Sequence, residues 1–377
     1  MDYKQNYAYS DWTVLIYAAG NNDLEYYIYQ QFQLIMNSID AENINVIVQI
    51  SRVPWSGQQH NNAVDIAEEW NGTRRYIIRN RTAVLVDDLG EINMSRPNTL
   101  LDFLIWGAST FPSRNIMAIL SGHGAGFVGI MKENTEKGAT IMGIQGFAKA
   151  LAIFRKSTNK KIDILVFDTC FMDTIEILYA IAINSNGAAV CAIISKNNLL
   201  VEGLPYYKII DILKRDSQKN QNILHLDKVI NLLITSVNIS KNHRDIDLLA
   251  IHLFEDDFII LKKLIDSISE VFKRDSNKFT CMLTNLGFYL LNNDFIDLSS
   301  LLNKYVHYYP DSDNSHNELL EVLNKIIIAP SLNKKDFGLK LFFPHNSQVY
   351  LKYFDLYKKM SFCCDNKWVE LIHETNL

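Results

Sequence analysis

Six short apolar runs in the first half of the chain constrain the fold more than any other feature of this sequence. They are WTVLIYAA (12–19), INVIVQI (44–50), TAVLV (82–86), IMAILSG (116–122), IDILVF (162–167) and AAVCAIIS (188–195). The runs are near-continuous and rich in Val and Ile rather than alternating with polar residues. This pattern predicts strands that are buried on both faces of a largely parallel sheet.

Stretches with helical spacing separate several of these runs. Apolar residues recur at intervals typical of amphipathic helices in residues 24–39, 99–108, 144–154 and 173–183. Strands that alternate with helices favour an α/β fold, because each helix covers one face of the sheet. We therefore predict a three-layer α/β/α sandwich.

The second half of the chain has a different pattern. Residues 206–309 are mainly helical in their spacing, DIDLLAIHL (245–253) is a possible strand, and GLKLFFP (338–344) predicts a late strand that ends at Pro344. The last segments predict helices that pack on the outside. We expect a catalytic core over 1–205, a mainly helical extension over 206–337, and closing elements of the same unit over 338–377.

Charge and hydropathy exclude several classes of partner. The 37 basic and 42 acidic residues give a net charge of −5, and no basic stripe is present. We therefore expect no binding to nucleic acid and no attraction to an anionic membrane. No apolar segment approaches the length needed to cross a bilayer, so we expect no membrane insertion. We expect the chain to act as a monomer.

The five cysteines do not predict a disulfide framework or a metal site. Their number is odd, no CxxC pair occurs, and no Cys/His spacing suits zinc. We therefore expect no metal ligands. The N-terminus lacks the basic start and apolar stretch of a signal peptide. This predicts a cytoplasmic protein if Met1 is the natural start, and a secreted one if a leader was removed.

Three predicted strands end in residues that are capable of chemistry: AAGNNDLE (18–25), SGHGAGF (121–127) and FDTC (167–170). In parallel sheets, functional groups gather just beyond the carboxyl ends of the strands. His123 follows one strand between Gly122 and Gly124, and Cys170 follows the next. An adjacent imidazole can generate a thiolate, and the backbone N–H groups of the two glycines and Cys170 can form an oxyanion hole. The alternatives are a loop histidine without a role and a buried structural cysteine.

Asp168 lies two residues before Cys170, so in a strand the two side chains point to the same side. At the bottom of a specificity pocket, its carboxylate would bind a cationic side chain. The alternative is a helix N-cap, a position where Asp is favoured.

Several motifs together resemble the clostripain family of cysteine peptidases. They are WTVLIYAAGNNDLE, GEINM with TLLDFLIW, ILSGHGAGF, ILVFDTCFMDTIEILYAI, GLPYY and GLKLFFP, and they occur in the family's order over nearly the whole chain. A His about fifty residues ahead of a Cys is also the chain order of caspases. The resemblance implies a caspase-like fold and cleavage of peptides or proteins after Arg or Lys.

The resemblance assigns roles by position. It makes Cys170 the nucleophile, His123 the catalytic histidine and Asp168 the acid that receives the basic P1 side chain. Some members depend on calcium, although no oxygen-rich loop here predicts a calcium site. Asn22 resembles an asparagine near the catalytic His in related peptidases; it either orients the imidazole or serves as a turn residue.

The resemblance also implies self-processing between the His and the Cys, since several members of the family are zymogens that cut themselves there. The polar segment MKENTEKGAT (131–140) contains Lys132 and Lys137 as candidate sites.

The loop after residues 188–195 departs from the family pattern. Acidic residues are usual there, whereas this chain has Ser195, Lys196 and two asparagines. If Ser195 and this loop border the P1 pocket, Lys196 would oppose a cationic substrate unless it points away or Glu202 offsets it. The alternative to a peptidase is a catalytically weak scaffold or signalling module. An acyltransferase or ligase using the same dyad also stays open.

Overall fold

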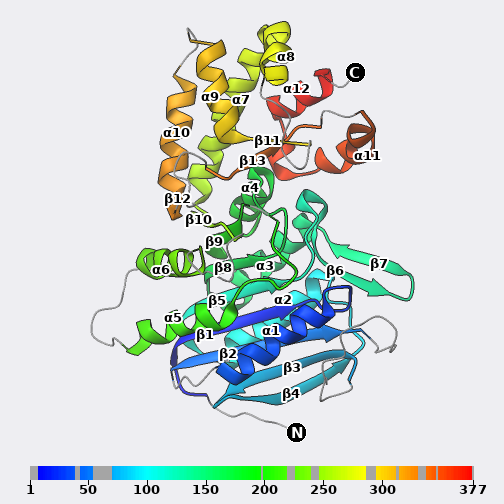
Figure 1. Cartoon of the computed structure of the whole chain (residues 1–377), viewed down its shortest axis with the longest axis vertical. Coiled ribbons are helices and arrows are strands. Elements are labelled where there is room, and N and C mark those ends of the chain that lie inside the picture. The colour runs from blue at the N-terminus through cyan, green and yellow to red at the C-terminus, as the bar shows by residue number, and fades with distance from the viewer. Residues whose placement is uncertain are drawn as a thin grey trace.

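A nine-stranded sheet forms the centre of the molecule (Figure 1). The computed structural model describes residues 7–38, 43–53, 70–196, 198–218, 226–238, 246–285, 294–310, 314–329, 337–344 and 347–375. In chain order the strands of the sheet are β1 (Ser10–Ala18), β2 (Ile44–Arg52), β3 (Gly72–Arg79), β4 (Thr82–Gly90), β5 (Ser113–Ser121), β8 (Ile162–Asp168), β9 (Ala189–Ser195), β10 (Leu248–His252) and β12 (Ile327–Ala329).

The middle of this sheet is parallel and its two edges are antiparallel. The spatial order is β12-β10-β9-β8-β5-β1-β2-β3-β4. The five strands from β9 to β2 pair in parallel, whereas β3 and β4 at one edge, and β10 and β12 at the other, pair antiparallel. The prediction of a largely parallel sheet is confirmed, and the possible strand at 245–253 contains β10, which lies between β9 and the edge strand β12.

One predicted strand is not buried as its composition suggested. The run at 82–86 is part of β4, the outer edge strand, where Val84, Leu85 and Val86 are 43–50% exposed. The chain turns back at Asn80 and Arg81, both with positive φ, which is typical of a two-residue hairpin turn. This turn pairs β4 with β3, a strand of mixed polar and apolar residues that the apolar pattern did not reveal.

Helices cover both faces of the sheet and confirm the three-layer sandwich (Figure 1). One face packs against α1 (Glu25–Ser38), α5 (Tyr206–Gln218) and α6 (Leu226–Asn238), whose apolar residues share a buried cluster with the sheet. The other face packs against α2 (Pro97–Thr110), α3 (Ile144–Thr158) and α4 (Ile175–Asn184) in a second cluster. The four helices predicted in the first half all occur close to their expected ranges.

The second half is mainly helical, as expected. It contains α7 (Glu255–Arg274), α8 (Ser276–Asn285), α9 (Leu298–Tyr308), α10 (Ser315–Ile326), α11 (Ser347–Tyr357), α12 (Lys367–Thr375), the 3-10 helix η2 (Ser361–Cys363), and a small sheet of β11 (Phe295–Asp297) with β13 (Lys340–Phe342). The predicted strand at 338–344 contains β13. These elements share the apolar cluster of α2, α3 and α4, so the core is continuous from the sheet into the C-terminal helices.

A two-stranded hairpin follows the 3-10 helix η1 (Gly126–Val128) and leads into α3. It consists of β6 (Ile130–Thr135) and β7 (Gly138–Met142), and it extends away from the sandwich (Figure 1). None of the five cysteines, all of which lie in the described ranges, is part of a disulfide. Within the described ranges, no helix has the length and apolar character needed to cross a membrane.

Candidate active site

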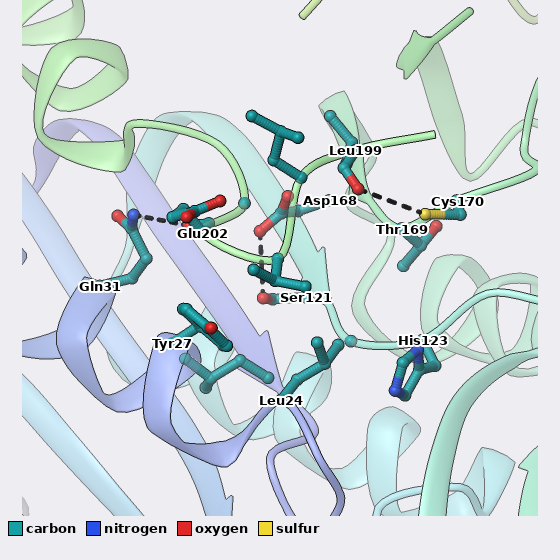
Figure 2. A pocket seen from close by; sticks show the side chains of 15 residues that line it. Leu24, Tyr27, Gln31, Ser121, His123, Asp168, Thr169, Cys170, Leu199 and Glu202 are labelled. Carbon is teal, nitrogen blue, oxygen red and sulfur yellow. Dashed lines mark hydrogen bonds between the residues drawn. The ribbon is translucent and has the colours of Figure 1, made fainter. Parts of the chain in front are cut away.

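A pocket lies at the carboxyl ends of the parallel strands, where sequence reasoning placed the site. The beginning of α1, the ends of β5 and β8, and residues 199–203 line it, and both His123 and Cys170 are among its lining residues (Figure 2). Ser121 on β5 is directly paired with Asp168 on β8. Each catalytic candidate follows that pair by two residues, which explains why His123 and Cys170 reach the same pocket.

Cys170 lies on a sharp turn between β8 and α4. The next residue, Phe171, has a φ of +62°, a conformation that is uncommon for residues other than glycine. The Sγ atom of Cys170 is 3.9 Å from the carbonyl oxygen of Leu199. Burial raises the pKa of the Cys170 thiol, and the nearby carboxylates add to the effect. The thiol therefore needs a base to become a nucleophile at neutral pH.

His123 is partly exposed, and one of its ring nitrogens has a carboxylate partner. Its Nε2 atom is 2.9 Å from Oδ1 of Asp23, in the turn between β1 and α1. Partial burial acts to raise the pKa of Asp23, but the contacts with His123 and Lys132 prevail and lower it. A carboxylate accepts hydrogen bonds, so Nε2 carries the donated proton and Nδ1 is the nitrogen left to act as a base.

Asn22 does not have the orienting role that was one of its two predicted roles. Its Nδ2 atom donates to the carbonyl oxygens of Ala19 and Lys132, and its Oδ1 accepts from the N–H of Leu24. Asn22 is buried and all three partners are backbone groups, so it shapes the turn. The contact with the imidazole comes from the next residue, Asp23, which sequence reasoning missed.

The two glycines beside His123 differ in their surroundings. A Cβ atom at Gly124 would lie 2.2 Å from the carbonyl oxygen of Cys170, so only glycine allows the two backbones to approach this closely. The N–H of Gly122 donates to the carbonyl oxygen of Asp168 at 3.3 Å. Gly122 therefore already has a backbone partner, which leaves Gly124 and Cys170 as the better candidates for an oxyanion hole.

Asp168 is a buried carboxylate in the pocket rather than a helix cap. The N-cap of α4 is Thr174, so the N-cap hypothesis for Asp168 is wrong. Its side chain accepts hydrogen bonds from Ser121, Leu204 and Tyr206. Burial raises the pKa of Asp168, and these three donors oppose that effect.

Comparison with known proteins identifies the family. The model of the clostripain family matches residues 16–374, nearly the whole chain. The chain belongs to the clostripain family. This is a family of cysteine peptidases, a class of hydrolases, and the membership is the one that the motifs predicted.

Relatives of known sequence and structure agree with this membership. Clostripain from Hathewaya histolytica is 23% identical over 231 residues, which cover 55% of this chain and 43% of clostripain, less than half of that relative. A secreted C11 cysteine protease from Bacteroides thetaiotaomicron, solved in complex with an irreversible peptide inhibitor, has a TM-score of 0.66 at 16% identity and covers 96% of this chain and 100% of that one.

A second solved structure, an inactive zymogen C11 protease from Parabacteroides distasonis, has a TM-score of 0.65 at 18% identity. It covers 95% of this chain and 99% of that one. At such identities the likeness shows the fold alone, which is the caspase-like sandwich that the motifs implied.

Lys196, which departs from the clostripain family pattern, does not line the pocket. The Nζ atom of Lys196 lies 3.4 Å from Oδ2 of Asp247, and the Lys196 side chain is only 9% exposed. Ser195 is also buried and does not line the pocket, so the prediction that it binds substrate is wrong. Glu202 does line the pocket, and its carbonyl oxygen accepts a hydrogen bond from Gln31 Nε2 at 2.8 Å (Figure 2).

The two lysines predicted as processing sites occupy different positions on the β6–β7 hairpin. Lys132 is within β6 between two buried residues, and its carbonyl oxygen accepts from Asn22 Nδ2 at 2.8 Å. Lys137 is exposed in the two-residue turn. Within the described ranges, no group of three or more His, Cys, Asp or Glu side chains is arranged to hold a metal ion.

Proposed function

We propose that the chain is an endopeptidase that cleaves peptides or proteins after Arg or Lys, with Cys170 as the nucleophile and His123 as the base and acid. One observation carries this proposal. A thiol, an imidazole and a buried carboxylate line the same pocket at the ends of two neighbouring parallel strands. The clostripain family match supports the same chemistry.

The geometry suggests how each group acts. Nδ1 of His123 takes the proton of the Cys170 thiol, and the sulfur attacks the carbonyl carbon of the scissile bond. The N–H groups of Gly124 and Cys170 stabilise the oxyanion. The imidazolium then gives its proton to the leaving amine. A water molecule activated by His123 hydrolyses the thioester, and the thiol is regenerated.

Asp168 would select a basic side chain at P1. It is a carboxylate in a pocket whose nearby walls include the apolar residues Leu24, Leu199 and Val201, which suit the methylene stem of Lys or Arg. The ion pair of Lys196 with Asp247 supports this assignment, because it removes the cation that would have opposed such a substrate.

Labelling with a peptidyl electrophile that carries Lys or Arg at P1 tests the proposal. We expect covalent labelling of the wild type under reducing conditions, assayed with and without calcium, and none of Cys170→Ala. The exposed cysteine variant Cys364→Ala is the matched control and should label like the wild type. A wild type that stays unlabelled in both conditions would favour the catalytically weak scaffold instead.

A further inference from the structure

The carboxylate of Asp168 already accepts three hydrogen bonds from within the protein. Its Oδ2 atom accepts from Ser121 Oγ at 3.1 Å and from the hydroxyl of Tyr206. Its Oδ1 atom accepts from the N–H of Leu204 at 3.0 Å. The side chain is only 7% exposed, so few other donors can reach it.

The backbone of Gly203 lies beside Oδ2 of Asp168 and further limits access to this atom. A Cβ atom at Gly203 would lie only 2.6 Å from Oδ2 of Asp168, and Gly203 has a φ of +67°. Both facts require glycine at this position, since no other residue fits the space or adopts this φ readily. Gly203 and Leu204 therefore lie directly against the carboxylate, and the chain that leads to them passes beside Asp168 in Figure 2.

Counting lone pairs shows what a substrate can still bind. A carboxylate has about four acceptor positions, two on each oxygen. Ser121 and Tyr206 use both positions on Oδ2, and Leu204 uses one on Oδ1. One acceptor position on Oδ1 is left. The fork-shaped guanidinium of Arg binds carboxylates best through two parallel hydrogen bonds, one to each oxygen, and this arrangement does not provide them.

A lysine ammonium has no such requirement. It is a compact charge with three rotatable donors, and a single accessible oxygen satisfies one of them. We propose that the pocket prefers lysine to arginine at P1, and that Tyr206 is a specificity-determining residue that imposes this preference by occupying Oδ2 of Asp168. This inference rests on the proposed function of Asp168 as the receptor of a basic P1 side chain.

Matched peptide substrates that differ only in P1 test the inference. We expect the wild type to cleave the Lys peptide with a kcat/KM at least roughly 10-fold above that for the Arg peptide, which corresponds to the loss of one charge-assisted hydrogen bond. A peptide with Gln at P1 should be cleaved poorly by comparison. The variant Tyr206→Phe removes the hydroxyl but keeps the buried ring, so the Lys to Arg ratio should fall toward one.

Two further variants make the test specific. Ser121→Ala frees the same oxygen by a different route and should lower the ratio in the same direction, even if Tyr206→Phe proves unstable. Tyr207→Phe changes the neighbouring tyrosine, which does not line the pocket, and should leave the Lys to Arg ratio of kcat/KM unchanged.

The possible failures are distinguishable. A wild type that cleaves after Arg as well as or better than after Lys overturns the inference and leaves the proposed function intact. If the Lys to Arg ratio is unchanged in folded Tyr206→Phe and Ser121→Ala, the two hydroxyls do not determine the P1 preference. Efficient cleavage after Gln but not after Lys or Arg would contradict the proposed role of Asp168 itself.

Discussion

Nε2 of His123 and Oδ1 of Asp23 are 2.9 Å apart, although the two residues are 100 positions apart in the chain. The same Oδ1 atom lies 3.6 Å from Nζ of Lys132. Asp23 comes from the turn after β1, His123 from the loop after β5, and these two strands are adjacent and parallel. The contact fixes which imidazole nitrogen carries the proton, and it leaves Nδ1 available to act as a base.

Replacing Asp23 should therefore slow catalysis without weakening substrate binding. In Asp23→Asn we expect kcat to fall by about 10-fold with little change in KM. The effect is modest because the Asp23 side chain is 68% exposed and its charge is screened by solvent. Steady-state kinetics on a Lys peptide measure it. Asp355→Asn, an exposed aspartate on α11, is the control; equal kcat values in both variants would exclude a positioning role for Asp23.

Substituting Gly124 should be far more damaging than substituting a glycine that has space around it. In Gly124→Ala the new Cβ atom would collide with the carbonyl of Cys170 and displace this proposed nucleophile, so we expect a loss of activity of at least about 100-fold. Gly143 has no atom within 4 Å of the corresponding Cβ position. Gly143→Ala should thus retain activity. Peptide cleavage assays on folded variants, checked by circular dichroism, distinguish the two.

Self-processing, if it occurs between His123 and Cys170, should take place after Lys137 rather than after Lys132. Lys137 is in an exposed turn, whereas the Lys132 carbonyl is held by Asn22 within a strand. Exposed turns are the preferred sites of proteolysis. Mass spectrometry of purified protein should find a new C-terminus at Lys137 that is absent in Lys137→Ala and in Cys170→Ala. A cut after Lys132, or an intact chain in active enzyme, would contradict this prediction.

The buried carboxyl group of Glu176 should make stability depend on pH. Glu176 on α4 accepts hydrogen bonds from the N–H of Phe342 and the hydroxyl of Tyr357 through Oε1, and so joins the core to the C-terminal elements. Burial raises the pKa of Glu176 to about 7, from 4.5. The folded state therefore binds a proton that the unfolded state releases between these values. Its contribution is fully present below about pH 4.5 and is lost as pH rises through about 7.

The variant Glu176→Gln resembles the protonated form and tests this linkage. We expect its free energy of unfolding to match the wild type near pH 5 and to exceed it near pH 8 by up to about 3 kcal/mol. Thermal or urea unfolding at both pH values measures the difference. The exposed variant Glu321→Gln on α10 is the control; a parallel pH profile in wild type and Glu176→Gln would show that the carboxyl group is ionised throughout.

The layers of the fold and the location of the candidate site were both predictable from the sequence. Continuous Val- and Ile-rich runs predicted strands buried on both faces, because such runs are typical of a parallel sheet that is covered on both sides. His123, Asp168 and Cys170 were predictable because each lies at the end of such a strand, and parallel strands bring their carboxyl ends to one edge.

The side chains that contact the candidate site residues could not be predicted from the sequence, because folding brings them together from separate segments. The sequence suggested Asn22 as a partner for His123, whereas the conformation of one turn brings Asp23 to the imidazole and directs Asn22 to backbone groups. Tyr206 reaches Asp168 from a distant segment, and Lys196 turns toward Asp247 instead of the pocket. The local sequence pattern shows which residues are apolar and how they repeat. The direction of a polar side chain depends instead on charged groups and hydrogen-bond donors that folding brings from elsewhere in the chain.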